Sequence, residues 1–279
     1  TTSMMEQGLK LAFVFDGVAP ELKRKEQERR AEVKKEATKE YEIAKQREDI
    51  DGMKKYASRT TKLTKEMVCD AKELISYLGL PIIQAKSEGE AQAAYLVKQK
   101  HAFACISQDF DTLLHGADNL IRNLSIAGKR KKTNKLGYVT VKPEILNLSD
   151  NLNNLGLDQD QLIALSMLIG TDYNIGGIKG LGPKKALTTV KKYKKDYAEM
   201  FKAVKWNESF EYNWEDVFYL IKKIPIEKDF ELKFSTPNFD KITEFLCEKH
   251  DFDKERVEKS LNKISQSNDI KQKGLGDFF

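Results

Sequence analysis

The chain has 279 residues, of which 40% are hydrophobic and 33% charged. This composition is typical of a soluble globular protein with one large domain or two small ones. The longest apolar run, 162–169, is too short to cross a bilayer, and no basic-then-apolar leader opens the chain. Three scattered cysteines and three histidines do not favour disulfide frameworks or thiolate and histidine metal sites. We therefore expect any metal to be held by carboxylates.

Positive charge is concentrated in one segment. The formal net charge is +5, and residues 20–65 alone carry 15 Lys and Arg against 10 Asp and Glu. Two further stretches, 128–135 and 173–195, contain five and seven basic residues and no acid. Solvated surface lysines explain any one of these patches, but the three together favour a polyanionic partner.

Strand and helix patterns alternate in the first part of the chain. Strands are predicted over 11–15, 80–83 and 103–107, and helices over 1–7, 64–78 and 87–99. Thr64 caps its helix, and Ser87 and Glu90 have the spacing of a capping box. Apolar residues on both faces of 11–15 and 103–107 are typical of parallel strands. We therefore expect an α/β fold, with a mostly parallel sheet flanked by helices on both faces.

Other segments have their own patterns. Residues 20–59 favour helix without a continuous apolar stripe, and acids and a glycine at 49–52 divide them into two helices that project into solvent. A basic hairpin is predicted over 129–141, with its turn near 134–137. Helices follow from 157 onward, and 265–273 is predicted to be a polar linker.

Six carboxylates stand out by their positions. Some directly follow a predicted buried strand, where the carboxyl ends of parallel strands meet a ligand crevice, and others begin or end a helix. A cap or a turn explains each one taken singly. Taken together, they favour a carboxylate cluster for magnesium or manganese. The six are Asp16, Glu88, Glu90, Asp109, Asp111 and Asp172.

A glycine-rich loop lies between two helical patterns at 176–186. Gly180 and Gly182 let backbone amides approach a phosphate, Pro183 suits the first turn of the next helix, and Lys184 and Lys185 follow. The alternative is an ordinary turn between helices. The adjoining lysines favour phosphate contact.

The chain ends in two aromatic residues. If the tail forms one helical turn, Leu275, Phe278 and Phe279 share a face and can enter a hydrophobic pocket of a partner. The alternative is that they pack against their own domain. The polar stretch before them argues for a partner.

Five segments stand in order along nearly the whole chain: VFDG at 14–17, SEGEAQA at 87–93, SQDFDTLLHG at 107–116, GTDYN at 170–174 and IKGLGPK at 178–184. In combination they closely resemble the flap endonucleases, structure-specific 5′ nucleases of the XPG family, and especially the archaeal ones. The resemblance implies a PIN-like 5′ nuclease fold. It places the nuclease core at 1–264, with a helical arch over 20–65, a helix-hairpin-helix-type element over 157–196 and a flexible tail over 265–279.

The resemblance also implies roles for individual residues. The six carboxylates match those that hold two Mg²⁺ ions, for which Mn²⁺ can substitute. Lys23 and Arg30 match a basic pair that reaches the scissile phosphate, and residues 176–185 match an element that grips duplex DNA and binds K⁺. The implied DNA contacts are Lys23, Arg30, Lys129, Arg130, Gly180, Gly182, Lys184 and Lys185. The implied contacts to the sliding clamp PCNA, through a PIP box, are Gln272, Leu275, Phe278 and Phe279.

We therefore expect a magnesium-dependent endonuclease that removes 5′ flaps, with 5′–3′ exonuclease action, in Okazaki fragment maturation and repair. We expect a cytoplasmic monomer without membrane attachment, or a nuclear one if the source is eukaryotic. The alternative hypothesis is a non-catalytic adaptor that tethers the clamp to branched DNA. Family members begin several tens of residues earlier, with a strand bearing another metal-binding aspartate, so we also expect the chain to be part of a longer one.

Overall fold

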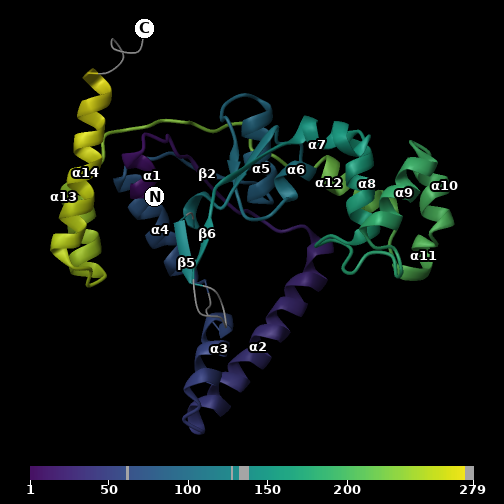
Figure 1. The fold of residues 1–279 in the computed structure, drawn as a ribbon, viewed down its shortest axis with the longest axis horizontal. Helices are drawn as coiled ribbons and strands as arrows, with labels where there is room; N and C mark the ends of the chain where they lie inside the picture. The colour runs from purple at the N-terminus through teal and green to yellow at the C-terminus, as the bar shows by residue number, and fades with distance from the viewer. Residues whose placement is uncertain (61–62, 127, 132–137, 274–279) are drawn as a thin grey trace. The chain divides into compact units, whose positions relative to one another are not determined.

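The computed structural model describes residues 1–60, 63–126, 128–131 and 138–273. The chain forms two compact units, which Figure 1 traces from the N-terminus to the C-terminus. Unit 1 combines Thr1–Phe15, Lys62–Gln84 and Lys228–Phe279, and unit 2 combines Asp16–Thr61 and Ala85–Glu227. In the described part of the chain, no helix has the length and apolar character needed to cross a bilayer.

Unit 1 contains a short parallel sheet and a helical core. Strand β1 (Phe13–Phe15) pairs with β2 (Ile82–Gln84), with Phe13 opposite Ile82. The side chain of Thr64 accepts a hydrogen bond from the Met67 amide (3.2 Å), which confirms the predicted cap. The helices of this unit are α1 (Thr2–Glu6), α4 (Lys65–Tyr77), α13 (Phe239–Thr243), the π-helix η3 (Glu244–Lys249) and α14 (Lys254–Lys273).

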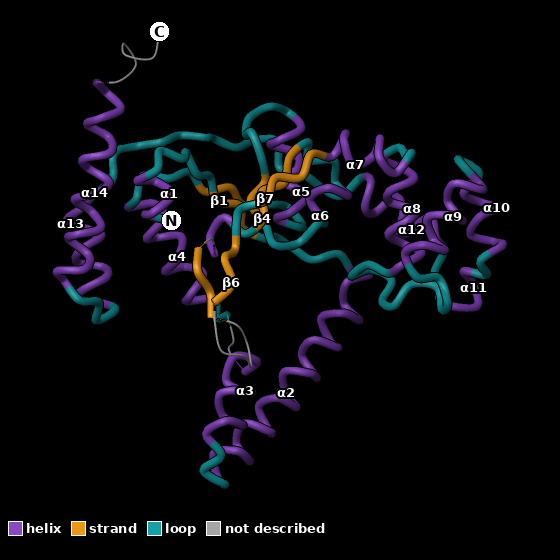
Figure 2. The backbone as a smooth tube through the Cα atoms, in the orientation of Figure 1, coloured by secondary structure: helices purple, strands orange, loops and turns teal. Residues whose placement is uncertain are grey.

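Unit 2 contains a mixed sheet and most of the helices. Strand β3 (Cys105–Ile106) lies parallel to β4 (Asn119–Arg122), which pairs antiparallel with β7 (Glu144–Asn147) (Figure 2). The predicted basic hairpin consists of β5 (Gly128–Lys131) and β6 (Tyr138–Val141), and its turn lies outside the described residues. The helices are η1 (Glu21–Lys23), α2 (Arg24–Gln46), α3 (Ile50–Thr60), α5 (Gly89–Lys98), α6 (Asp111–Leu114), η2 (Leu124–Ile126), α7 (Leu148–Leu155), α8 (Gln159–Ile169), α9 (Pro183–Tyr193), α10 (Tyr197–Ala203), α11 (Trp206–Ser209) and α12 (Trp214–Lys222).

The strands are shorter and more exposed to solvent than their sequences predict. β3 has two residues, and Phe103, predicted to lie in a buried strand, precedes it with 72% of its surface exposed. β1 is half-buried along its whole length. The apolar residues on both faces of these segments therefore predicted longer and more deeply buried strands than the structure has. The α/β class is nevertheless confirmed, and β1 with β2 and β3 with β4 pair in parallel. In the described residues, however, the strands form three small sheets with two antiparallel pairings, not the single, mostly parallel sheet that we expected.

Two local predictions were wrong, and for the first of them the reason is that tertiary contacts compete for the same groups. The capping box at Ser87 does not form: helix α5 begins after Glu88, and the Ser87 hydroxyl donates to the carbonyl of Val18 (3.1 Å). The Glu90 carboxylate accepts instead from Ser107 (2.9 Å). The polar stretch 265–273, predicted to be a linker, continues helix α14.

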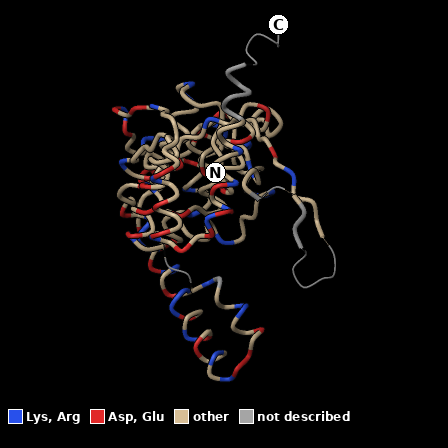
Figure 3. Tube along the Cα trace, turned by 90° about the vertical axis from the view of Figure 1, so that its left-hand side faces the viewer, with Lys and Arg blue, Asp and Glu red and all other residues tan. Residues whose placement is uncertain are grey.

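Helices α2 and α3 lie side by side, as Figure 1 shows. Ala37 and Ala44 of α2 are buried, and small side chains let the two backbones approach closely. The Asp49 carboxylate accepts from the Gly52 amide (2.9 Å) at the start of α3, so the predicted division of this segment is confirmed. Acidic and basic residues are interspersed along α2 (Figure 3), which explains the missing apolar stripe, whereas α3 carries one acid and three basic residues.

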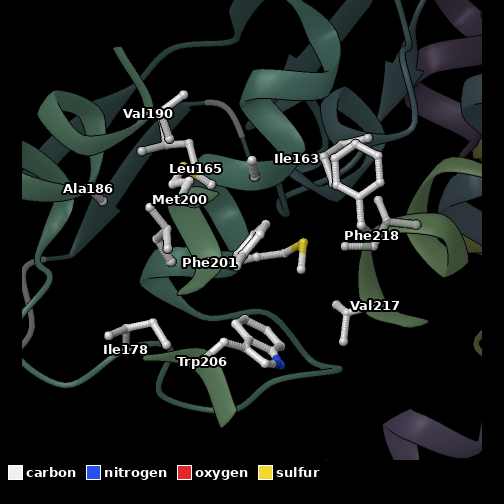
Figure 4. Packing of buried hydrophobic residues seen from close by; sticks show 14 of the residues in the cluster. Ile163, Leu165, Ile178, Ala186, Val190, Met200, Phe201, Trp206, Val217 and Phe218 are labelled. Carbon is white, nitrogen blue, oxygen red and sulfur yellow. The ribbon is translucent and has the colours of Figure 1, made fainter. Parts of the chain in front are cut away.

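The largest core of unit 2 lies among helices α8 to α12 (Figure 4). Phe201, fully buried, stacks on Trp214 at a centroid distance of 4.8 Å and meets Trp206 edge-on at 5.2 Å. The indole nitrogen of Trp206 donates to the carbonyl of Tyr212 (2.8 Å). This aromatic core fixes the helices that follow the glycine-rich loop.

We predict that Phe201→Ala lowers the free energy of unfolding by about 3–5 kcal/mol, because it leaves a cavity between two indole rings. Urea unfolding followed by tryptophan fluorescence measures this, since both tryptophans lie in unit 2. Phe103→Ala is the matched control, and its exposed ring should contribute less than about 1 kcal/mol. Equal losses in the two variants would contradict the assignment of this core.

Candidate active site

Asp16 lies at the N-terminus of helix α5. Its carboxylate accepts a hydrogen bond from the amide of Gly89 (2.6 Å), where a negative charge also stabilises the helix dipole. A Cβ atom at position 89 would lie 2.8 Å from this carboxylate, so the close approach requires glycine. Two segments far apart in the sequence are thereby joined at the start of the helix that carries Glu88 and Glu90.

Lys23 lies between two of the predicted carboxylates. Its ammonium nitrogen is 2.5 Å from Glu88 Oε2 and 3.2 Å from Asp172 Oδ2, and all three side chains are at least 74% buried. Burial alone would lower the pKa of Lys23, but the hydrogen bonds and charges of Glu88 and Asp172 raise it above its ordinary value. The ammonium therefore remains charged and compensates two carboxylates at once.

A tight turn after helix α8 places Asp172. The Thr171 hydroxyl donates to Asn174 Oδ1 (2.6 Å), and the fully buried Asn174 amide donates to the carbonyl of Met167 (2.7 Å). The hydroxyl of Tyr212 donates to the carbonyl of Tyr173 (2.8 Å). Because the turn is anchored to its own helix and to a second segment, the carboxylate of Asp172 has a fixed position.

Glu90, Asp109 and Asp111 repel one another electrostatically. Burial and the charges of Asp111 and Asp109 raise the pKa of Glu90 to about 7, although the hydrogen bond from Ser107 opposes the rise. Asp111 retains contact with solvent, yet desolvation and the charges of Asp172 and Asp109 raise the pKa of its carboxyl. The site therefore holds more negative charge than its own cations neutralise.

Four of the six carboxylates line one pocket. Arg30 reaches the rim of this group, with Nη2 2.9 Å from Asp172 Oδ1. Asp16 and Asp109 are not among the pocket's lining residues, although Asp109 acts on Glu90 and Asp111 through its charge. The lining residues are Lys23, Glu88, Glu90, Asp111, Leu114, His115, Thr171, Asp172, Tyr173 and Ile221.

Two titratable lining residues, His115 and Tyr173, were not singled out by the sequence. Burial lowers the pKa of His115 to about 4, so its ring is neutral, and Nδ1 lies 3.2 Å from the carbonyl of Ile221. Tyr173 is also buried, and desolvation together with the carboxylates raises its pKa. Both lie within the motifs at 107–116 and 170–174, but nothing in those patterns shows that these side chains face the pocket.

The chemistry of the donors fits a hard divalent cation. The pocket gathers carboxylate oxygens whose pKa values are raised by mutual repulsion, and a cation of the protein, Lys23, already lies between two of them. In the side-chain positions described, no three Asp, Glu, His or Cys residues are arranged as ligands of one ion. The fit therefore rests on donor type and charge.

The other predicted contacts lie elsewhere in the chain. Lys129 and Arg130 belong to strand β5. Gly180 has a φ of +85°, which favours glycine, whereas Gly182 is the N-cap of helix α9 with an ordinary φ of −74°. Pro183 occupies the first turn of α9 as predicted, followed by the exposed Lys184 and Lys185. Gln272 lies in the last turn of α14, and Leu275, Phe278 and Phe279 lie outside the described residues.

We predict a pH-dependent stability difference between the wild type and Glu90→Gln in EDTA. The folded protein raises the pKa of Glu90 from 4.5 to about 7, so the destabilising ionisation is absent below pH 4.5 and complete only above about pH 7. Glu90→Gln keeps an acceptor for Ser107 and should therefore raise Tm at pH 8 but not at pH 4.5. A Tm difference that is the same at both pH values would contradict the assigned repulsion.

Comparisons with known proteins give the family. The XPG I-region family model matches residues 79–172, which contain five of the six carboxylates and end at one of them, Asp172, whereas Asp16 lies outside the match. Flap endonuclease 1 of Staphylothermus marinus is 45% identical over 278 residues, covering 99% of this chain and 79% of the relative. The enzyme of Thermococcus onnurineus is 43% identical over 271 residues, covering 96% and 76%.

Solved structures agree with the sequence relatives. Flap endonuclease-1 from Methanococcus jannaschii has a TM-score of 0.71 at 33% identity, covering 97% of this chain and 80% of that one. The catalytic core of Rad2 in complex with a DNA substrate shares the fold, with a TM-score of 0.66 at 22% identity over 94% of this chain and 81% of that one. The chain therefore belongs to the flap endonuclease 1 family of archaeal type, within the XPG nucleases.

Proposed function

We propose that this protein is a structure-specific nuclease that cleaves 5′ flaps from branched duplex DNA, with 5′–3′ exonuclease action, during Okazaki fragment maturation and repair. The proposal rests above all on one observation: carboxylates from three separate segments line a single pocket together with Lys23. Membership of the flap endonuclease 1 family supports the same reaction.

We further propose that the six carboxylates, Asp16, Glu88, Glu90, Asp109, Asp111 and Asp172, hold two Mg²⁺ ions, for which Mn²⁺ can substitute. Bound there, the metal would lower the pKa of a water and stabilise charge on the phosphate oxygens. The pocket has an excess of hard oxygen donors, and four of the six line it directly. Lys23 carries one positive charge against the two carboxylates of Glu88 and Asp172, so negative charge remains that a metal ion would balance.

Lys23 and Arg30 act on the phosphate in this proposal. Both cations reach the pocket from the segment that begins helix α2, and both contact Asp172. A phosphodiester placed there would meet one ammonium and one guanidinium, which neutralise charge that develops as the bond breaks. The raised pKa of each group keeps it protonated at neutral pH.

DNA recognition depends on shape in this proposal. Residues 20–65 admit the single-stranded flap, and Lys129 and Arg130 contact the DNA backbone. The loop at 176–185, with Gly180, Gly182, Lys184 and Lys185, grips duplex phosphates and binds K⁺. Lysines exposed in the first turn of α9 support the phosphate contact, since a helix N-terminus also attracts anions. Little base reading is then required.

In this proposal the C-terminal tail binds a second protein. Gln272, Leu275, Phe278 and Phe279 are proposed to dock on the sliding clamp PCNA, which raises the local concentration of the enzyme at replication sites. The protein would act as a monomer in the cytoplasm. The non-catalytic adaptor is not favoured, because an adaptor has no use for carboxylates that repel one another in a pocket.

We predict that the protein cleaves a 5′-labelled flap duplex with Mg²⁺ and not with EDTA. Asp172→Asn keeps the size of the side chain but removes the charge that Lys23 and Arg30 contact, so the cleavage rate should fall by about 10³-fold. Flap binding, measured by fluorescence anisotropy, should persist.

Asp150→Asn is the matched control for this measurement, because it removes one exposed carboxylate of unit 2 outside the pocket. Its cleavage rate should equal that of the wild type. Near-normal cleavage by Asp172→Asn, or binding without metal-dependent cleavage by the wild type, would reject the proposed reaction.

We predict that Phe278→Ala combined with Phe279→Ala weakens binding to the clamp by at least about tenfold, because two buried aromatic anchors are lost. Surface plasmon resonance on immobilised PCNA measures this. Flap cleavage without the clamp should stay unchanged. Unchanged clamp affinity in the double variant would show that these aromatics do not anchor the tail.

A further inference from the structure

Glu26 is a buried carboxylate outside the pocket that the proposed reaction does not use. It lies in the first turn of helix α2, and its side chain is 5% exposed. Its Oε1 atom accepts hydrogen bonds from Arg29 Nη2 (2.7 Å) and Arg30 Nε (2.6 Å), and its Oε2 atom accepts from Arg29 Nε (2.7 Å). One carboxylate therefore binds two adjacent guanidinium groups.

This arrangement differs from an ordinary surface pair on a helix. Arg24 and Glu28, one helical turn apart on the same helix, approach only to 3.6 Å and remain 66% and 64% exposed. Exposed pairs of that kind hold their side chains weakly. Glu26 is buried and makes three charge-assisted hydrogen bonds, which are shorter and stronger than neutral ones.

The carboxylate of Glu26 stays ionised at neutral pH. The hydrogen bond from Arg29 is the largest influence, and with Arg30 it outweighs burial and lowers the pKa of Glu26 to about 2. A buried carboxylate without partners would be strongly destabilising, so the two arginines and Glu26 depend on one another.

The contacts of Arg30 point in two directions. Its Nε–H group is taken by Glu26, and its Nη2 atom lies 2.9 Å from Asp172 Oδ1 at the pocket. The side chain is otherwise 58% exposed, so apolar packing does little to hold it. A long exposed side chain has many rotamers, and the hydrogen bond at Nε selects those that direct the far end toward Asp172.

We propose that Glu26 is a positioning residue that holds the guanidinium of Arg30 beside Asp172 before DNA binds. The inference rests on the proposed function, in which Arg30 meets the scissile phosphate. Glu26 does not touch the phosphate, and its effect passes through Arg30. The adjacent Arg29 donates hydrogen bonds to both oxygens of the same carboxylate.

Glu26→Gln tests this role. Glutamine keeps the size of the side chain but replaces one acceptor oxygen with an NH₂ group, so Arg29 and Arg30 cannot both be bound as before. Under single-turnover conditions with excess enzyme and Mg²⁺, the cleavage rate should fall by about ten- to hundredfold, because a misplaced catalytic group loses orientation. Glu208→Gln removes the same charge from an exposed ion pair outside residues 20–65 and outside the pocket, and it should cleave like the wild type.

A double-mutant cycle separates positioning from a general effect on folding. In an Arg30→Ala background, Glu26→Gln should slow cleavage no further, because the group it positions is gone. Glu26→Asp, which keeps the charge, should recover part of the rate. A wild-type rate in Glu26→Gln, or the same loss in both backgrounds, would overturn the proposal.

A spectroscopic measurement tests the contact between Glu26 and Arg30 separately from the proposed nuclease function. In ¹⁵N NMR spectra of the metal-free protein, the Arg30 Nε–H signal should exchange slowly with water in the wild type and in Glu208→Gln, and quickly in Glu26→Gln. Equal exchange in all three would overturn the proposed hold on Arg30 whether or not the protein cleaves DNA. If the signal exchanges slowly in the wild type but the wild type does not cleave flaps, the proposed function is contradicted and the hold on Arg30 is not. An Arg30→Ala variant as active as the wild type would reject both the role of Arg30 and this inference.

Discussion

Repulsion among carboxylates is the constraint on which the site of unit 2 depends. Glu90 and Asp111 have raised pKa values because neighbouring acids and desolvation oppose their ionisation. Lys23 offsets part of this cost by lying between Glu88 and Asp172. A site built in this way is under electrostatic stress without a cation, which is the physical basis for expecting metal there.

The fold supplies the rigidity that this repulsion requires. Asp16 is hydrogen-bonded to the first turn of α5, and Asn174 ties the turn that carries Asp172 to helix α8. Behind that turn, the aromatic core around Phe201 fixes helices α8 to α12. The acids therefore come from separate segments, each anchored by contacts that do not involve the other acids, so they cannot relax apart when they repel.

Residues 21–30 bring two cations to this site. The 3-10 helix η1 brings Lys23 to Glu88, and the first turns of α2 bring Arg30 to Asp172, where Arg30 also donates a hydrogen bond to Glu26. The rest of the α2 and α3 pair carries intermixed charges and packs through small residues such as Ala37 and Ala44. The segment from η1 to α3 therefore combines a charged surface with two cations placed at the pocket.

The sequence by itself determined the family, the α/β class and the positions of the six acids, because motif spacing and the ends of apolar runs are local properties of the chain. It also located the division between α2 and α3 and the cap at Thr64. It overstated strand length, and it assigned Ser87 and Glu90 to a capping box because it could not show that Val18 and Ser107 compete for them. Only the tertiary structure decided which acids line the pocket and that His115 and Tyr173 join them, since those facts depend on distances between segments far apart in the sequence, such as Lys23 and Asp172, 149 positions apart. The binding of two arginines by Glu26 is local in sequence, but the contact of Arg30 with Asp172 also depends on the tertiary fold.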